Sequence, residues 1–332
     1  MTMPRAAAGA RPRVEVITFG ETMLRLAPLG SERLEQAATL EVRVGGSESN
    51  MAVALAGLGH SVAWWSRLPA SPIGVRIESE VRRWGVNTSH VIWDAGSDAR
   101  AGLYFVSFGA PPWHVEVTYD RAHSAASAIS AADITRERAT GAKLLHVSGI
   151  TPALSPSCKD AVQAAVSTAR AAGMAVSIDV NYRARLWSAA DCRKALTPLL
   201  TKANLLICTR SDAQEVFGLS GRAEAVAVAM RERFCTEAAV ITCGSDGAVA
   251  ATGDETFSVC GYQLREIVDP VGAGDAFCAG LLHGWLEGSV QVGLAYGVAM
   301  AAMKHGAPGD MLIAPLTAIE RVMAGGDGRI AR

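Results

Sequence analysis

The sequence predicts an α/β fold in which a doubly wound, mainly parallel sheet carries helices on both faces, with a small separate β-sheet added. Three observations support this prediction. The chain has 332 residues, of which 50% are hydrophobic, enough for one large α/β domain or two small ones. Short apolar runs alternate with helical segments along most of the chain, which is the rhythm of β-α-β units. Strand-like runs without helices interrupt this rhythm over residues 100–127.

Composition narrows the class of protein. The formal net charge of -1 argues against nucleic acid and anionic membranes as partners. Seven scattered cysteines without a C-x-x-C pair argue against zinc and a disulfide framework, and favour buried, reduced thiols in the cytoplasm. Residues 1–13 lack the apolar segment of a signal peptide, so we expect a disordered tail followed by one domain over residues 14–332. No apolar run is long enough to cross a bilayer.

The first buried strand is expected at residues 14–19, ending just before Glu21. Ligand sites of α/β proteins form at such strand ends, although Glu21 also fits a solvated loop carboxylate. Residues 23–44 alternate in places between apolar and polar side chains, which predicts two half-exposed antiparallel strands. The diglycine at 45–46 precedes a helical run from Met51 and, by itself, indicates a turn and a helix cap.

The chain then returns to alternating strands and helices. We expect strands at 62–67, 91–93, 144–149, 175–179, 205–208 and 238–242, and helices at 73–84, 157–172, 209–218 and 295–305.

Two further strand-like runs, at 103–106 and 115–119, flank a Pro111-Pro112 turn. With the earlier strand pair they predict a small sheet inserted at about residues 23–44 and 100–120. Such a sheet exposes an apolar face unless it covers a ligand site or pairs with a second copy of itself.

The most informative stretch runs from Asp269 to Gly280 and reads D-P-V-G-A-G-D-A-F-C-A-G. It lies between a strand-like run at 262–268 and an apolar, helix-compatible segment at 276–285. Its glycines allow a tight turn, and the unpaired amides that open the next helix favour an anion such as phosphate. Asp275 in this turn either stabilises the helix by its charge or acts as a general base, and the spacing leaves both open.

This stretch resembles the C-terminal signature of the ribokinase-like (PfkB) sugar kinases, usually D-T-x-G-A-G-D, with Pro270 in place of the threonine. The resemblance covers the chain from about residue 14 to 319. It implies a ribokinase-like fold with a β-sheet lid and phosphoryl transfer from ATP. In that family the three small residues hold the phosphoryl group and the last aspartate is the base, which assigns these roles to Gly272, Ala273, Gly274 and Asp275.

The run G-G-x-x-x-N-x-A at 45–52 resembles the N-terminal signature of the family. The tyrosines and the arginine on the lid strands, and D-x-N-x-R-x-x-L-W at 179–187, resemble the branch that phosphorylates 2-keto-3-deoxygluconate. A guanidinium suits a substrate carboxylate because it donates two parallel hydrogen bonds. An exposed Tyr and Arg on an edge strand are the alternative. The implied sugar contacts are Glu21, Gly45, Gly46, Asn50, Tyr104, Tyr119, Arg121, Asn181, Arg183 and Asp275. Arg183 is a candidate for either the substrate carboxylate or the phosphates.

The nucleotide site follows from a T-x-G-x-x-G turn after the strand at 238–242, which resembles the ATP-binding turn of these kinases. Its implied contacts are Ser211, Thr242, Gly244, Ser245, Gly247, Gly272 and Gly274. The N-x-x-E pattern of the family, whose glutamate organises Mg²⁺ through water, matches at Glu215, with Asp212 where asparagine is expected. An acidic first turn of a surface helix is the alternative. Val298 stands where many sugar-acid kinases carry an asparagine near the adenine.

We therefore expect an ATP- and Mg²⁺-dependent kinase for the primary hydroxyl of 2-keto-3-deoxygluconate, and the resemblance also allows a monovalent cation. A neutral-sugar or nucleoside kinase and a catalytically silent sugar-binding protein remain alternatives. A nicotinamide-dependent dehydrogenase is disfavoured because no G-x-G-x-x-G follows the first strand. The resemblance implies a homodimer formed through the lid. Of the other residues in these motifs, His123 is expected to be structural, Arg185 to form a surface ion pair and Trp187 to pack in the interior.

Overall fold

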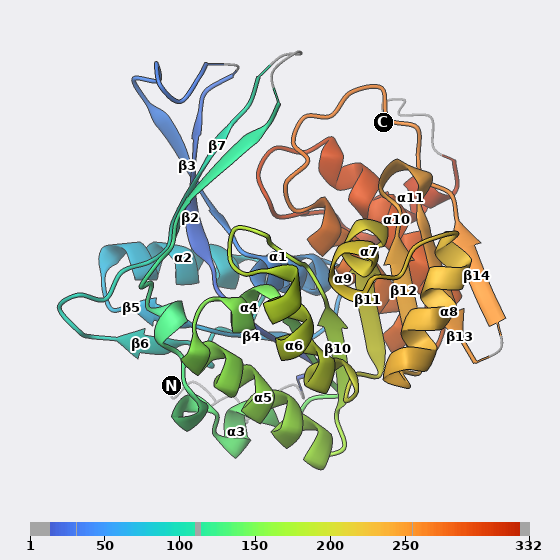
Figure 1. Ribbon diagram of the computed structural model, residues 1–332. Helices are drawn as coiled ribbons and strands as arrows, with labels where there is room; N and C mark the ends of the chain where they lie inside the picture. Colours follow the sequence, from blue (N-terminus) through green and yellow to red (C-terminus); the bar gives the residue numbers. More distant parts are fainter. Residues whose placement is uncertain (1–13, 31, 110–113, 254, 326–332) are drawn as a thin grey trace, which may run out of the picture.

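The computed structural model describes residues 14–30, 32–109, 114–253 and 255–325. The expected disordered tail and the Pro111-Pro112 turn lie outside these residues. An eight-stranded sheet with helices on both faces forms the main body, and a four-stranded sheet projects from it (Figure 1). This arrangement confirms the predicted fold class.

The large sheet has the order β14-β13-β12-β11-β10-β9-β1-β4. The strands from β12 to β4 run parallel, and β13 and β14 are antiparallel to their neighbours. Because β1 pairs with both β4 and β9, the chain winds first to one side of β1 and then to the other. The strands are β1 (Val16–Phe19), β4 (Val62–Trp65), β9 (Leu144–Ser148), β10 (Ala175–Asp179), β11 (Leu205–Thr209), β12 (Ala238–Thr242), β13 (Ala248–Thr252) and β14 (Glu255–Val259).

Helices cover the two faces of this sheet because successive strand residues point to opposite sides. Val16 packs in one hydrophobic core and Ile17 in the other. The first core includes α1 (Ser47–Gly57), α2 (Pro72–Arg83), α9 (Ala273–Leu286), α10 (Val290–His305) and α11 (Leu316–Met323). The second includes α3 (Arg136–Ala139), α5 (Pro156–Ala171), α6 (Ala189–Leu200), α7 (Arg210–Phe217) and α8 (Ala223–Phe234), while the short α4 (Ile150–Ala153) follows β9.

The four-stranded sheet, called the lid here, has the order β3-β2-β7-β8. Its strands are β2 (Met23–Pro28), β3 (Leu40–Gly45), β7 (Leu103–Ser107) and β8 (Glu116–Asp120). Met23, Ala27, Tyr104 and Val106 form its small core. The lid predicted from the two insertions is therefore present, and β8 is its most exposed strand.

Several expected boundaries differ. The run at 62–67 divides between β4 of the large sheet and β5 (Arg67–Pro69), which pairs with β6 (Ile92–Asp94) in a separate ribbon. Helix α1 begins at Ser47, four residues earlier than expected. Its start is stabilised by Asn50, whose Oδ1 accepts a hydrogen bond from the Gly46 amide at 3.2 Å. Asn50 therefore lies within the first turn of a helix.

The strand expected at 262–268 is absent, because this segment pairs with no strand and its side chains are mostly exposed. Its apolar residues Leu264, Ile267 and Val268 face solvent, and the Val268 amide bonds to the carbonyl of His305 at the end of α10. β-Branched residues indicated a strand here, but a strand also needs a neighbour for its backbone groups.

The seven cysteines are free thiols. Four are buried as expected, whereas Cys235 and Cys260 are exposed and Cys243 is partly exposed. Within the described ranges, no helix has both the length and the apolar character needed to span a bilayer.

Candidate active site

A cleft of about 580 Å³ lies where the carboxyl ends of the parallel strands meet the lid. Glu21 follows β1, Asp179 ends β10, Thr209 ends β11 and Thr242 ends β12, and all four line the cleft. The volume suits a small-molecule site, and strand ends of a doubly wound sheet are where such sites form.

One wall of the cleft is the turn from Asp269 to Gly274, called the anion loop here. Gly272 has a φ of 87°, and a Cβ at this position would lie 2.0 Å from the carbonyl oxygen of Asp310. The Ala273 amide faces the Pro270 carbonyl at 3.4 Å. The amides of Gly274 and Asp275 have no acceptor among the described residues. These two amides, at the start of α9, are free to donate hydrogen bonds to an anion.

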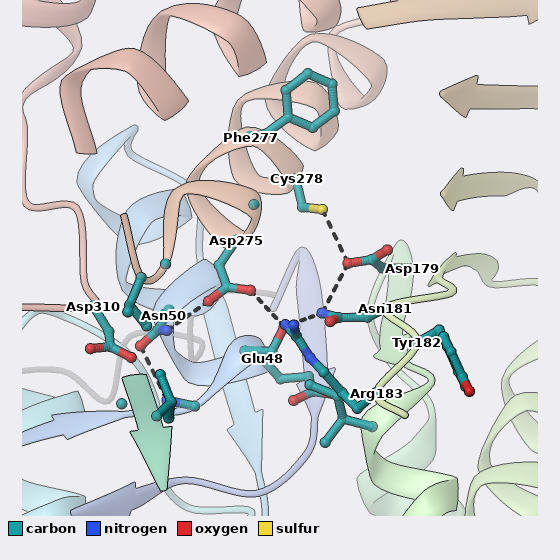
Figure 2. Close-up of a pocket in the computed structure, with 18 of the residues that line it drawn as sticks. Glu48, Asn50, Asp179, Asn181, Tyr182, Arg183, Asp275, Phe277, Cys278 and Asp310 are labelled. Carbon is teal, nitrogen blue, oxygen red and sulfur yellow. Dashed lines mark hydrogen bonds between the residues drawn. The ribbon is translucent and has the colours of Figure 1, made fainter. Parts of the chain in front are cut away.

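Asp275 lies in the first turn of α9 beside these amides. Its two carboxylate oxygens accept hydrogen bonds from Ser47 Oγ and Asn50 Nδ2, both at 2.7 Å. Figure 2 shows the Asp275 carboxylate directed towards Asn50 and the centre of the cleft. Burial raises the pKa of Asp275 although both hydrogen bonds favour its charged form. The side chain is thus held in place with an increased affinity for a proton.

Asp179 was noted in the sequence only as part of a motif, and the structure brings it to the centre of the site. Asn181 has a φ of 40° and donates from Nδ2 to Asp179 at 3.1 Å and to Ser47 at 3.2 Å. Burial raises the pKa of Asp179 to about 7, and repulsion from Asp212 and Asp275 adds to this effect. Three carboxylates therefore share one end of the cleft.

Arg183 is a positive group that acts on all three carboxylates. It lowers the pKa of Asp179, Asp212 and Asp275, and Figure 2 shows it extending from its loop towards Asp275 and Asn181. The side chain is exposed and forms no hydrogen bond or ion pair with any described residue. Its donors are therefore available to a ligand.

On the lid side of the cleft, the charged side chains bind one another. Arg121 bonds to Glu21 through Nε at 2.9 Å and also through Nη2. Ser124 Oγ donates to the other oxygen of Glu21. Tyr104 and Tyr119 are cross-strand neighbours whose rings stack at 5.9 Å. The implied sugar contacts Glu21 and Arg121 thus bind one another in this structure.

A buried charge network joins the lid to the anion loop. Arg25 of β2 forms ion pairs with Asp269 at 2.7 Å and with Asp310. Asp310 also accepts a hydrogen bond from the Tyr104 hydroxyl at 2.5 Å, and burial raises the pKa of Asp310. Asp269 accepts hydrogen bonds from the amides of Val271 and Gly309. Sequence reasoning missed this network, and its only signal was a lone arginine in an apolar strand.

The cleft brings together most residues singled out in the sequence. Lining it are Glu21, Gly45, Gly46, Asn50, Tyr104, Tyr119, Arg121, Asn181, Arg183, Ser211, Thr242, Gly272, Gly274 and Asp275. Ala273, Gly244, Ser245, Gly247 and Glu215 do not line it. Sequence reasoning also missed Glu48, a buried carboxylate in the first turn of α1 that Ser148 and Thr151 hydrogen-bond.

Two side chains lie differently from expectation. Glu215 is exposed on α7, while Asp212 on the preceding turn lines the cleft and accepts a hydrogen bond from the Tyr182 amide at 3.3 Å. Residues three apart lie on the same helix face, but Asp212 is one turn nearer to the start of α7, and of the two only Asp212 lines the cleft. Arg185 donates to the carbonyl of Val117 in lid strand β8 at 2.6 Å, not to a carboxylate.

The cleft offers oxygen ligands for a cation rather than a closed metal cage. Asp179 and Asp212 both line it, and their repulsion is relieved by positive charge. In the described part of the chain, no three His, Cys, Asp or Glu side chains converge on one metal position. This donor set fits Mg²⁺ held partly by substrate phosphates.

Comparison with known proteins agrees with this geometry. The family model described as pfkB family carbohydrate kinase matches residues 14–316. The chain is 40% identical over 319 residues to the 2-dehydro-3-deoxygalactonokinase of Haloferax volcanii, covering 96% of this chain and 99% of the relative. It is 32% identical over 304 residues to the 2-dehydro-3-deoxygluconokinase of Bacillus subtilis, covering 90% and 92%. The structure of the 2-dehydro-3-deoxygluconokinase of Thermotoga maritima matches with a TM-score of 0.89 at 31% identity, covering 95% of this chain and 99% of that one.

Proposed function

The chain belongs to the pfkB family of carbohydrate kinases, and from this premise we propose that it transfers the γ-phosphoryl group of ATP to the primary hydroxyl of 2-dehydro-3-deoxygluconate. The observation that carries the sugar-acid assignment is Arg183, an exposed guanidinium in the same cleft as Asp275 and the anion loop, unpaired among the described residues. A guanidinium recognises a carboxylate by two parallel hydrogen bonds. Arg121 supports this role more weakly, because two of its nitrogens already contact Glu21.

The relative from Haloferax volcanii favours a second candidate within the same class. Its name contains the galactonate form of the acid, and it shares 40% identity with this chain. We therefore include the galactose-derived epimer as an alternative substrate. Both acids present a carboxylate and a primary hydroxyl, so the roles of Arg183 and Asp275 are the same for either.

The chemical step assigned to the cleft is an in-line phosphoryl transfer. Asp275 accepts the proton of the substrate hydroxyl while the hydroxyl oxygen forms a bond to the γ-phosphorus of ATP. The bond from that phosphorus to the bridging β-γ oxygen breaks, and ADP leaves. The free amides of Gly274 and Asp275 stabilise charge on the transferring group. The increased proton affinity of Asp275 suits a general base.

The remaining site assignments divide between the metal and the nucleotide. Mg²⁺, when bound with ATP, neutralises phosphate charge, and Asp179 and Asp212 are the cleft carboxylates that would hold it. Thr242 and Ser211 would contact the nucleotide from the strand ends. The turn that contains Gly244, Ser245 and Gly247 lies between β12 and β13, next to Thr242. Glu215, which the sequence suggests for the metal, has less support than Asp212, because Glu215 does not line the cleft.

We also infer a homodimer formed through the lid, supported by its exposed strand β8, and a cytoplasmic location, supported by the seven free cysteines. Light scattering after gel filtration measures the first, and a monomer at micromolar concentration would contradict it.

The decisive assay measures ADP release with MgATP against a panel of acceptors. It contains 2-dehydro-3-deoxygluconate, its galactose-derived epimer, gluconate, fructose, ribose and adenosine. We expect selective turnover of the two keto-deoxy acids. Preferred turnover of a neutral sugar would overturn the role of Arg183, and no turnover of any acceptor would favour a catalytically silent binding protein. Arg193→Ala, at an exposed position on α6, is the matched control for Arg183→Ala.

A further inference from the structure

Lys304 is a fully buried lysine that the phosphoryl transfer does not use. It lies in the last turn of α10 with none of its surface exposed. Its Nζ donates to the backbone carbonyls of Ala307 at 2.8 Å and Asp269 at 3.2 Å. Among the described residues, it forms no ion pair with a carboxylate. Lysine is almost never fully buried without a partner, so this position calls for a physical explanation.

The ammonium group contacts the first residue of the anion loop through the Asp269 carbonyl. Asp269 opens that loop, and its carboxylate bonds to the amides of Val271 and Gly309. The loop after α10 reaches Asp310, whose carbonyl packs against Gly272. Lys304 therefore joins two segments: the anion loop, through the Asp269 carbonyl, and the loop after α10, through the Ala307 carbonyl.

The family resemblance allows a bound monovalent cation, so we asked whether the residues around the anion loop could hold one. Backbone carbonyl oxygens are the ligands that replace the hydration shell of such an ion. The carbonyls of Asp269 and Ala307 converge, but the ammonium of Lys304 already occupies the space between them. A separate ion at these two carbonyls does not fit.

We propose that the Lys304 ammonium is a built-in monovalent cation that positions the anion loop, so that turnover requires no added potassium or sodium. This inference concerns the same site as the proposed kinase activity and rests on it. Lys304 acts as a positioning residue, because it contacts the backbone of the loop and not the transferring group.

The surrounding charges support a protonated Lys304. Burial lowers its pKa, and the carboxylates Asp269, Asp310 and Asp275 oppose that change, while Arg25 adds to it. Three carboxylates thus raise the proton affinity of the ammonium, and one guanidinium lowers it. A simpler role is also available, because a lysine near the carboxyl end of a helix stabilises its last carbonyls. The experiment has to separate that role from a built-in cation.

The first measurement uses the wild-type protein without any substitution. Its melting temperature and its ADP release are compared in potassium, sodium and tetramethylammonium chloride at equal ionic strength. We expect the rates in the three salts to agree within about twofold and the melting temperatures to agree within error. Strong stimulation or stabilisation by potassium alone would overturn the proposal.

The second measurement uses Lys304→Ala, which leaves a space beneath the carbonyls, with Lys194→Ala on the exposed face of α6 as control. In tetramethylammonium chloride we expect turnover of the Lys304 variant to fall about 10–100-fold. Losses of this size are typical when a residue that positions the ligands of a metal site is replaced. Potassium or ammonium chloride should restore part of that turnover and raise the melting temperature without substrate. Unchanged turnover, or a loss that no cation restores, would leave only the structural role and overturn the proposal.

The two readouts separate this inference from the proposed function. If the wild-type protein phosphorylates none of the acceptors, the kinase assignment fails, while the melting temperatures still decide whether cations fill the vacated position. If Lys304→Ala does not fold, the wild-type comparison alone decides.

Discussion

The two ends of the cleft balance their charges differently. At the lid end, three charged residues that line the cleft form ion pairs: Arg121 pairs with Glu21, and Asp310 pairs with the buried Arg25 behind it. At the strand end, Asp179, Asp212 and Asp275 form no ion pair with any described residue, and burial raises the pKa of all three. Arg183 beside them is also unpaired among the described residues.

The lid end therefore has its charges neutralised within the protein, whereas the charges at the strand end are left for ligands to neutralise. A buried ion pair is costly to break, because it leaves an uncompensated charge. The lid end is therefore fixed before anything binds. The strand end gathers negative charge and one exposed arginine, an arrangement that a cation and an anionic ligand would neutralise. Four predictions test the contrast.

The largest effect is expected for Asp275→Asn at the strand end. The amide keeps the size of the side chain and removes its ability to accept the substrate proton, so turnover should fall about 10²–10⁴-fold. ADP release measures the loss, and calorimetry with ATP should show nearly unchanged binding. Retained turnover would exclude Asp275 as the base.

At the lid end, Arg25→Met should lower stability rather than chemistry alone. Asp269 and Asp310 would be buried without their cation, at a cost of about 3–5 kcal/mol. Urea unfolding measures this change. Arg100→Met is the control, because its ion pair with Asp120 is exposed and should contribute about 0–1 kcal/mol. Equal costs for the two variants would mean that the network does not fix the lid.

The two arginines of the substrate site should respond differently. Arg183→Ala should lower kcat/KM for the keto-deoxy acid about 10–100-fold, the value of charged hydrogen bonds, with unchanged stability. Arg121→Ala should reduce both activity and stability, because buried Glu21 loses its cation. Steady-state kinetics and urea unfolding distinguish the two. A stability loss for Arg183→Ala as large as that for Arg121→Ala would remove the contrast.

The smallest effect is the pH dependence of stability from Asp179. Its pKa is about 7 in the folded protein against an ordinary value of 3.8. Between these pH values the folded state holds a proton that the unfolded chain releases, so stability falls as pH rises, by at most about 1.4 kcal/mol per pH unit. Asp179→Asn should flatten this slope in metal-free buffer, whereas Asp160→Asn on the exposed face of α5 should not. An unchanged slope in Asp179→Asn would place the ionisation elsewhere.

Local patterns predicted much of this molecule. Apolar runs of five or so residues became the parallel strands, and the glycine-rich turn before α9 became the anion loop with Asp275 in the first helical turn. These features depend on backbone conformation and on residues close in the chain, so a sequence can specify them directly. The lid was predicted for a similar reason, since its strands alternate in polarity.

Contacts between distant segments needed the tertiary structure. Arg25 and Asp310 are 285 residues apart, and no local pattern indicates that they pair. That Asp212 and not Glu215 lines the cleft depends on how α7 packs against β11. The segment at 262–268 forms no strand, because no neighbouring strand pairs with it. Lys304 reads as one charge near the end of an apolar helix. Only the fold brings its ammonium to the Asp269 carbonyl at the start of the anion loop, because burial and charge balance depend on all the segments that meet there.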